Sequence, residues 1–274
     1  MAGILVALAS LIACEPSSSD PYALSAESSP NQQSLTSRAD DKGSSAKGPI
    51  VLELFTSQGC SSCPPADRLL RELKSQSDSS ESPFPQDLIV LSEHVDYWNR
   101  LGWTDPYSSS KFSARQQSYA QLTGDQVYTP QMVIQGKYSM VGHSRSEIVP
   151  AIRRAAAMQQ HKIELGFVIP PGRTNVSVEA RIAGYSGPIV LFLAEDGIQN
   201  HVPRGENADR DLLHDGVVRD LKNASCAKGK CKGELDLKPE YHFQNLRIVA
   251  LLQEPGGPIH GAAQLSPADG KKSK

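Results

Sequence analysis

Two cysteines three residues apart, in the segment Cys60-Ser61-Ser62-Cys63, are the residues of this chain best suited to chemistry. Thiols at this spacing can close a small disulfide. An apolar, β-prone run at 50–55 precedes them, and residues 64–73 follow with apolar side chains on one helical face. At the start of a helix, unpaired backbone N–H groups and the positive end of the helix dipole favour the thiolate of Cys60, which is the nucleophilic form. The sequence therefore predicts thiol–disulfide chemistry.

The residues alone allow three interpretations of this pair. In the redox interpretation, Cys60 attacks a partner disulfide, or is attacked by a partner thiolate, and Cys63 resolves the mixed disulfide. In the structural interpretation the pair is an inert bridge, although so short a loop constrains the unfolded chain little. A metal site needs about four ligands, and the other cysteine pair is far away in the sequence. We favour the redox interpretation, with no metal and no organic cofactor.

A second signature is Thr129-Pro130, directly before a predicted β-hairpin of residues 131–134 and 138–141. An X–Pro bond adopts the cis form at small cost, and a cis bond before a strand is usually a structural device. Such a proline leaves a backbone carbonyl and N–H free for an extended substrate chain, and it keeps metal away from the thiols. We therefore predict that Thr129 and Pro130 bind substrate opposite the cysteines.

Three polar residues are candidates for proton transfer or for tuning the thiolate. Glu53, if buried, could accept the proton of the resolving thiol; the alternative is a carboxylate on an exposed strand face. His94 and Asp96 follow a short apolar strand at 88–91, at the carboxyl edge where open α/β sheets carry their active sites. His94 could tune the thiolate or donate a proton. The alternative is a polar loop packed by aromatic side chains.

The remaining cysteines indicate the compartment. Cys226 and Cys231 form a second close pair, and Cys14 is the fifth cysteine. Two close pairs in an exported chain suggest two disulfides, because export implies an oxidising environment. Four cysteines allow three connectivities, of which the local pairing has the shortest loops. On that pairing, Cys226–Cys231 is a structural staple on a polar turn.

The N-terminus predicts export. Residues 3–13 are apolar over the length of a signal-peptide core, too short to cross a membrane as a helix, and no Lys or Arg precedes them. The run ends in small residues and Cys14, which resembles a bacterial lipobox with Cys14 lipidated; the alternative is an ordinary signal peptide. Residues 15–47 are polar and predict a disordered tether. The expected location is the periplasm or cell envelope, with a possible lipid anchor through Cys14.

The pattern of elements divides the rest of the 274-residue chain. Residues 48–160 show the order strand, CxxC, helix, strand, helix, β-hairpin, helix, which is that of a thioredoxin-like α/β domain. Residues 161–266 contain several short strands between turns, typical of a small antiparallel β sandwich. Residues 267–274 predict a polar tail. A net charge of −2 gives no argument for nucleic acid, and no apolar run reaches the length of a membrane span.

Several longer motifs surround these residues, among them Glu53–Asp67, His94–Trp98 and Tyr128–Met132. They resemble those of the DUF1223 family of secreted bacterial proteins. The resemblance implies a thioredoxin-like domain and no established activity, and it covers about residues 48–265. In ordinary thioredoxins the acidic residue on the first strand lies one position closer to the CxxC than Glu53 does. One residue flips a strand face, so Glu53 takes that role only with a bulge. The motifs are Glu53–Asp67, His94–Trp98, Gly102–Pro106, Ala114–Gln116, Tyr128–Met132, Arg204–Asn207, His214 and Val217–Arg219.

A charge-rich cluster in the C-terminal half has two interpretations. It could bind a protein partner or a metal, or it could be a solvated polar network, which we favour because charged loops are usually solvated. Its members are Arg204, Glu206, Asn207, Asp209, Arg210, His214 and Arg219.

These patterns predict an envelope thiol–disulfide oxidoreductase that acts on protein thiols or disulfides through Cys60 and Cys63 and exchanges electrons with a redox partner. The alternative is a non-catalytic thioredoxin-fold module that binds a protein or a metal. The direction of electron flow depends on the reduction potential, for which Ser61-Ser62 is not diagnostic.

Overall fold

A computed structural model describes residues 45–169 and 174–266 of the chain. The predicted signal segment, Cys14, most of the predicted tether and the tail at 267–274 lie outside the described residues. All described residues belong to one compact unit, Asp41–Lys274.

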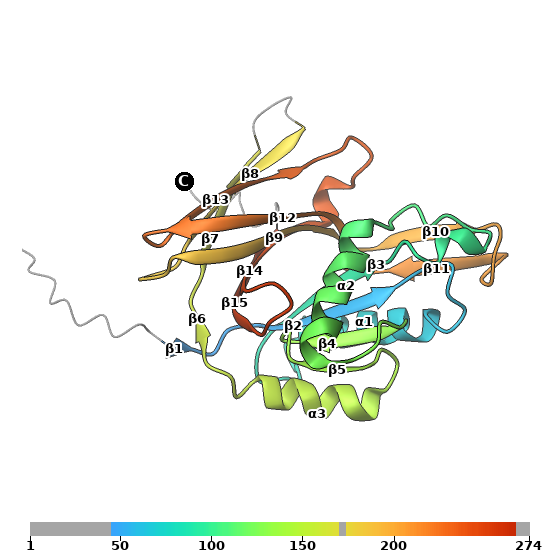
Figure 1. The fold of residues 1–274 in the computed structure, drawn as a ribbon, viewed down its shortest axis with the longest axis horizontal. Coiled ribbons are helices and arrows are strands. Elements are labelled where there is room, and N and C mark those ends of the chain that lie inside the picture. The colour runs from blue at the N-terminus through green and yellow to red at the C-terminus, as the bar shows by residue number, and fades with distance from the viewer. Residues whose placement is uncertain (1–44, 170–173, 267–274) are drawn as a thin grey trace, which may run out of the picture. The chain divides into compact units, whose positions relative to one another are not determined.

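A large mixed sheet dominates this α/β fold (Figure 1); eleven strands of the described ranges belong to it. Its first part contains β2 (Ile50–Thr56) and β3 (Leu88–His94), which are parallel. Strand β4 (Gln131–Ile134) pairs antiparallel with β2 and, through a tight turn, with β5 (Tyr138–Val141). The apolar runs of β2 and β3 are buried along their whole length, as expected for parallel strands covered on both faces.

The second part of the sheet continues from β3. Strand β12 (Val217–Ala227) joins β3 through one parallel pair and then pairs antiparallel with β9 (Gly187–Glu195). Beyond β9 lie β14 (Leu246–Gln253) and β15 (Ile259–Leu265). One sheet therefore runs across the predicted boundary at residue 160, and the division into two domains stays a prediction about folding units.

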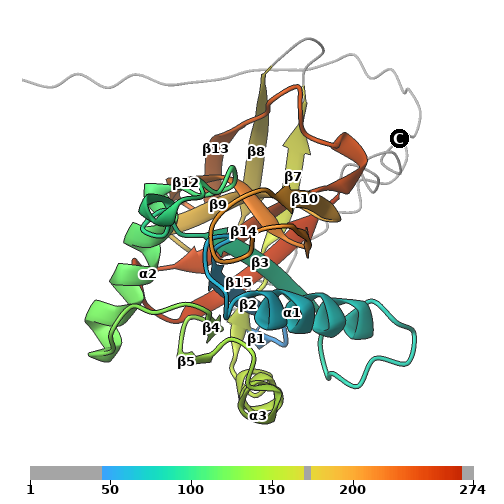
Figure 2. The same ribbon diagram turned by 90° about the vertical axis from the view of Figure 1, so that its right-hand side faces the viewer.

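Helices cover both faces of the first part (Figure 2). Helices α1 (Pro64–Ser77) and α3 (Arg145–Ala155) pack on the face that carries Leu52 and Leu54 of β2. Helix α2 (Ser110–Thr123) packs on the opposite face, where its Phe112 joins an apolar cluster of β2, β3 and β9. No helix within the described ranges is long and apolar enough to cross a membrane.

Three strands fold over the second part of the sheet. Strands β7 (Glu164–Val168), β8 (Asn175–Arg181) and β13 (Lys230–Asp236) pair with one another, and β13 joins β12 only at its turn. Alternate residues of β8 share a buried apolar core with β9 and β14. One face of β8 is therefore inside, and its other face is turned toward solvent.

A separate hairpin contacts α1. It consists of β10 (Ile198–Val202) and β11 (Arg210–His214), joined by the loop 203–209. Sequence patterns did not predict β10, β11, β12 or β15. The short elements are β1 (Ser45–Ala46), which pairs with β6 (Gln160–His161), and the 3-10 turns Asn99–Leu101 and Phe243–Asn245.

Candidate functional site

The two predicted thiols form a disulfide between the end of β2 and the start of α1. The Cα atoms of Cys60 and Cys63 are 5.4 Å apart. Both residues have no exposed surface, whereas Ser61 and Ser62 between them are exposed. Any molecule that approaches this turn therefore meets the serines first, and the sulfur atoms become accessible only if the structure opens.

One expectation about Cys60 needs correction. Helix α1 has Cys63 as its N-cap and begins with Pro64 and Pro65, which have no N–H to offer. The next two N–H groups, of Ala66 and Asp67, donate to the carbonyl of Cys63 at 2.8 and 3.1 Å. The free N–H groups expected beneath the Cys60 sulfur are thus largely missing, so the helix N-terminus stabilises its thiolate less than predicted.

The Thr129–Pro130 peptide bond is cis and lies directly before β4. The indole N–H of Trp98 donates to the Thr129 hydroxyl at 2.8 Å. A Cβ on Gly142 would lie 3.0 Å from Cβ of Pro130 and 3.1 Å from Cβ of Ala66. Gly142 therefore lies against both the prolyl ring and the first turn of α1, which places Thr129-Pro130 at the cysteine end of the helix.

Gln58, two residues before Cys60, is the centre of a buried polar network. Its side-chain oxygen accepts hydrogen bonds from the Trp103 indole N–H at 3.1 Å and the Asn200 amide at 2.8 Å. Its backbone N–H donates to Asp105 at 2.8 Å. The carbonyl of Gln58 accepts from the Asn207 amide at 3.0 Å. Gln58 is fully buried and ties the CxxC turn to residues more than 140 positions away.

The same network fixes the tautomer of His214. Because the Gln58 oxygen is already an acceptor, its Nε2 must donate to His214 Nε2, 3.2 Å away. The proton of His214 then lies on Nδ1, which faces Asp67 Oδ1 at 3.5 Å. That distance is longer than a normal hydrogen bond, and Nδ1 has no closer partner among the described residues. Both residues line a cavity of about 180 Å³ between α1 and β11.

Asp67 was not singled out from the sequence, yet it lies one helical turn after Cys63. Residues four apart share a helix face, and both side chains are buried. Its second oxygen accepts from the Thr56 hydroxyl at 3.2 Å. Asp67 is therefore the carboxylate placed on the Cys63 side of α1, and the i+4 spacing in the sequence was the signal for it.

His94 is the last residue of β3 and is fully buried. Its Nδ1 lies 2.7 Å from Asp105, and its ring centroid lies 4.8 Å from that of His214. Burial by itself would lower the pKa of His94, but the charge and hydrogen bond of Asp105 outweigh burial and raise that pKa. Burial would likewise raise the pKa of Asp105, and His94 outweighs it and lowers that pKa. The pair thus favours imidazolium and carboxylate beside the CxxC loop.

The structure does not bring Glu53 to the cysteines. Its carboxylate faces α2, on the opposite side of β2 from α1, and it pairs with Arg115 at 2.6 Å and with the Tyr119 hydroxyl. Glu93 completes this buried cluster, 3.4 Å from Arg115. The one-residue offset in the sequence made a proton-transfer role for Glu53 conditional on a bulge, and the alternative of a carboxylate on an exposed strand face is wrong, because Glu53 is fully buried.

Asp96 also has a local partner. Its carboxylate accepts from the Ser113 hydroxyl, whose oxygen in turn accepts from the Asp96 N–H at 3.1 Å. Asp96 therefore fastens the segment after β3 to the first turn of α2, and no described contact joins it to the cysteines.

Four members of the charge-rich cluster lie near the CxxC turn or α1: His214, described above, and Glu206, Asn207 and Arg210. The Asn207 amide donates to the carbonyl of Cys60 at 2.8 Å, and Glu206 accepts from the Ser61 N–H at 2.9 Å. The Ser61 hydrogen bonds lower the pKa of Glu206. The Arg210 guanidinium donates a hydrogen bond to the side-chain oxygen of Asn207 at 3.1 Å. These residues form a latch from the loop 203–209 to the CxxC turn, which the sequence alone did not reveal.

The other members of that cluster lie elsewhere. Arg204 and Asp209 are exposed residues of the loop. Arg219 stacks over the rings of Tyr107 and Tyr241 and lies 3.4 Å from Glu195. The described residues contain no group of three or more His, Cys, Asp or Glu side chains placed to hold a metal ion.

The second disulfide, Cys226–Cys231, joins β12 to β13 at their turn, with its Cα atoms 4.2 Å apart. It links β12 to β13, one of the three strands that fold over the sheet, and takes no part in the Gln58 network. Its position is that of a staple on a β-turn.

Fold and site together define a class: an α/β protein with a buried CxxC disulfide latched by a distant hairpin. A family model described as "Protein of unknown function (DUF1223)" matches residues 51–253, and the chain belongs to this family. A crystal structure of a protein from Agrobacterium tumefaciens, a structural genomics target, is 24% identical over 84% of this chain and 98% of that chain, with a TM-score of 0.60. That similarity concerns the fold alone. A search of curated proteins found no match.

Proposed function

We propose that this protein is a thiol–disulfide oxidoreductase of the cell envelope, built on a thioredoxin-like arrangement of β2, α1, β3, β4, β5 and α3. The observation that carries the proposal is the Cys60–Cys63 disulfide at the start of α1, with buried acid–base residues behind it. The cis Thr129-Pro130 bond beside the same helix end supports a substrate-binding role. Two disulfides fit an oxidising compartment. Lipid anchoring through Cys14 belongs to the same proposal.

The chemistry is an exchange of sulfur bonds. In the oxidising direction a substrate thiolate attacks Cys60, the Cys60–Cys63 bond breaks, and Cys63 leaves as a thiolate that takes up a proton; a second substrate thiolate then attacks the substrate sulfur of the mixed disulfide and releases Cys60. In the reducing direction the Cys60 thiolate attacks a substrate disulfide and releases one substrate thiolate; Cys63 then loses its proton and attacks Cys60, which releases the other. Two electrons move in each complete cycle, and a dithiol or disulfide of the redox partner restores the starting state. No other cofactor is required.

Asp67 is the group that we assign to the Cys63 proton. It lies one turn further along α1, and its neighbour His214 lines the same small cavity, which offers the proton a route to solvent. In the resolving step Asp67 accepts the proton as Cys63 forms its new bond. A positioned base typically contributes a factor of about 10² or more.

Asp67→Asn should therefore slow resolution of a mixed disulfide about a hundredfold at pH 7, measured by release of a chromogenic thiol. The defect should shrink at pH above about 9, because Cys63 then ionises without a base. A merely structural role would leave an equal defect at every pH. The control is His201→Gln. His201 is an exposed histidine on the β10–β11 hairpin that also carries His214, and its replacement should not change the rate of resolution.

The latch must open before a partner can react. Asn207→Ala removes two hydrogen bonds to carbonyls of the CxxC turn. The Cys60 carbonyl keeps its bond from the Cys63 N–H at 3.2 Å, whereas the buried Gln58 carbonyl loses the Asn207 amide at a cost of about 1–3 kcal/mol. We expect reduction of Cys60–Cys63 by a small thiol, followed by mass spectrometry of alkylated peptides, to accelerate about 10- to 100-fold. Asn223→Ala, an exposed residue of β12, is the control.

This experiment also tests the function itself. The wild type should exchange slowly and the Asn207→Ala variant quickly, each reaching the same equilibrium with glutathione. If neither protein exchanges at Cys60–Cys63, the oxidoreductase proposal is wrong. The complete burial of both sulfur atoms would then favour the second candidate, a non-catalytic envelope module in which the disulfide is structural.

A further inference from the structure

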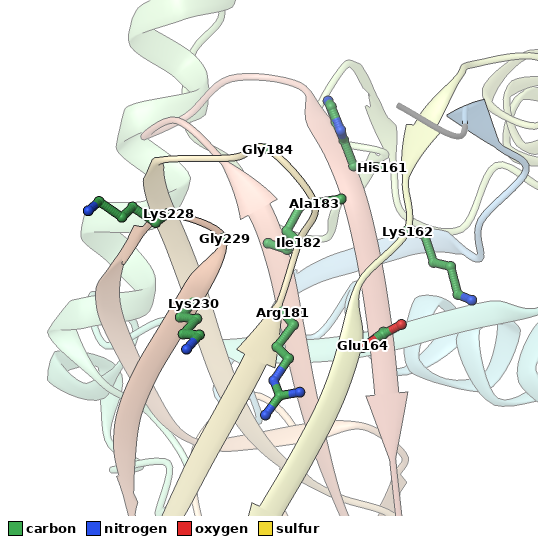
Figure 3. A pocket seen from close by; sticks show the side chains of 10 residues that line it. All are labelled: His161, Lys162, Glu164, Arg181, Ile182, Ala183, Gly184, Lys228, Gly229 and Lys230. Atoms are coloured by element: carbon green, nitrogen blue, oxygen red, sulfur yellow. The ribbon is translucent and has the colours of Figure 1, made fainter. Parts of the chain in front are cut away.

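A second cavity, about 340 Å³ in volume, lies far from the CxxC turn, where β6, β7, β8 and the β12–β13 turn meet (Figure 3). Four cationic side chains line it, together with one carboxylate, Glu164. Figure 3 shows that they come from separate segments of the chain. The cations are Lys162, Arg181, Lys228 and Lys230.

None of these four cations forms an ion pair with a described residue. Neighbouring lysines on the same strands do: Lys232 lies 2.7 Å from Glu179, and Lys222 lies 2.9 Å from Asp236. Glu164 is the register partner of Arg181 but makes no ion pair with it within the described ranges. Positive charge is therefore in excess here: four cations and one carboxylate line the cavity, and the neighbouring Glu179, whose pKa is lowered first by Lys232 and then by Arg181 and Lys230, is paired with Lys232.

The turn that carries two of the lysines is held firmly. The Cys226–Cys231 disulfide closes it. The Gly229 N–H donates to the Tyr185 carbonyl at 2.7 Å, and its carbonyl accepts from Ile182 at 2.9 Å. Gly229 has φ +74°, and a Cβ there would lie 2.6 Å from the Ile182 carbonyl oxygen. The second disulfide thus presents Lys228 and Lys230 from a fixed backbone.

The N-terminal segment joins the structure at the rim of this cavity. Strand β1 pairs with β6 so that Ser45 lies opposite His161, and His161 lines the cavity. The sequence predicts a lipid anchor at Cys14 and a polar tether after it. Thirty residues, 15 to 44, separate Cys14 from Ser45 in the sequence. An anchored protein would therefore keep this cavity within reach of the bilayer.

We propose that this cationic cavity binds the phosphate-bearing headgroups of an anionic membrane surface. Lysine and arginine near such a surface are attracted to its negative potential over roughly the Debye length. The unpaired cations supply the charge, the stapled turn supplies a fixed geometry, and the entry point of the tether supplies the proximity. The inference is independent of the thiol chemistry.

The test measures co-sedimentation of the full chain carrying Cys14→Ser with vesicles of phosphatidylcholine alone or with 30% phosphatidylglycerol. The neutral vesicles account for binding by the apolar N-terminal run. We expect binding that requires the anionic lipid and that weakens strongly between about 50 and 300 mM salt. The variant Lys228→Glu/Lys230→Glu should lose about tenfold or more of it, whereas Lys222→Glu/Lys232→Glu, with the same charge change outside the cavity, should lose no more than about twofold.

Three results would overturn the proposal. Equal binding to both kinds of vesicle, or equal losses in the two charge-reversal variants, would show that the cavity is not the contact. Binding of inorganic phosphate in the cavity without binding to anionic vesicles would identify a site for the free ion instead. Circular dichroism spectra of the variants establish that each one is folded.

Discussion

Replacing Cys60 with serine should abolish disulfide exchange with a protein substrate, whereas replacing Cys63 with serine should leave the first attack intact and accumulate a covalent mixed disulfide. The two outcomes differ because only one sulfur meets the partner. Both cysteines are fully buried, but the Cys60 sulfur lies 3.4 Å from the hydroxyl of the exposed Ser62, while Cys63 caps α1 one helical turn before Asp67. Without Cys63 no intramolecular thiolate can release the substrate.

The measurement is non-reducing electrophoresis and intact mass after mixing each variant with a disulfide-containing protein. The control is Cys226→Ser/Cys231→Ser, which removes the other bridge and should exchange like the wild type. Trapping by Cys60→Ser instead of Cys63→Ser would reverse the assigned roles. Unchanged turnover in both variants would end the oxidoreductase account.

Replacing Arg115 with methionine should lower the free energy of unfolding by about 3–5 kcal/mol, because it leaves the buried carboxylate of Glu53 without its cation. Arg115 from α2 pairs with Glu53 of β2 at 2.6 Å and with Gln253 of β14 at 2.7 Å, so one side chain joins a helix to distant parts of the sheet. Urea denaturation measures the loss. The exposed Arg153→Met on α3 is the control and should change stability by less than about 0.5 kcal/mol.

Glu93, in the same buried cluster, should make the free energy of unfolding fall as pH rises. Burial raises the pKa of Glu93 well above its ordinary value; Arg115 lowers it by a smaller amount and Glu53 raises it further. As pH rises above about 4.5 the unfolded chain loses this proton while the folded protein keeps it, so Glu93 makes stability fall with rising pH. Glu93→Gln should remove that fall and be more stable than the wild type at pH 7. A variant that instead loses stability there would contradict this assignment.

Local patterns predicted the elements that carry the cysteines. The apolar run at 50–55, the helical spacing after Cys63 and the Gln135-Gly136 turn correspond to β2, α1 and the β4–β5 hairpin. Each depends on neighbours in sequence, so periodicity and turn chemistry suffice.

The latch and the His214–Asp67 contact could not be predicted in that way. Asn207 is 147 residues from Cys60, and Gln58 is 156 residues from His214. His214 ends β11, and the loop with Asn207 joins β10 to β11; both strands are short and have few apolar positions to mark them. Glu53 is an intermediate case: its one-residue offset from the CxxC made the predicted role conditional on a bulge, but its actual partners, Arg115 and Tyr119, lie more than 60 positions away.

The most direct test of the central claim is the reduction potential of Cys60–Cys63, measured by equilibration of the full chain against glutathione with quantification of alkylated peptides. We predict a reversible two-electron equilibrium between about −120 and −270 mV, the range of thiol–disulfide oxidoreductases. The Cys226–Cys231 bridge is an internal reference and should remain oxidised. A Cys60–Cys63 potential below about −300 mV, or no equilibration even in Asn207→Ala, would mean a structural disulfide and contradict the account.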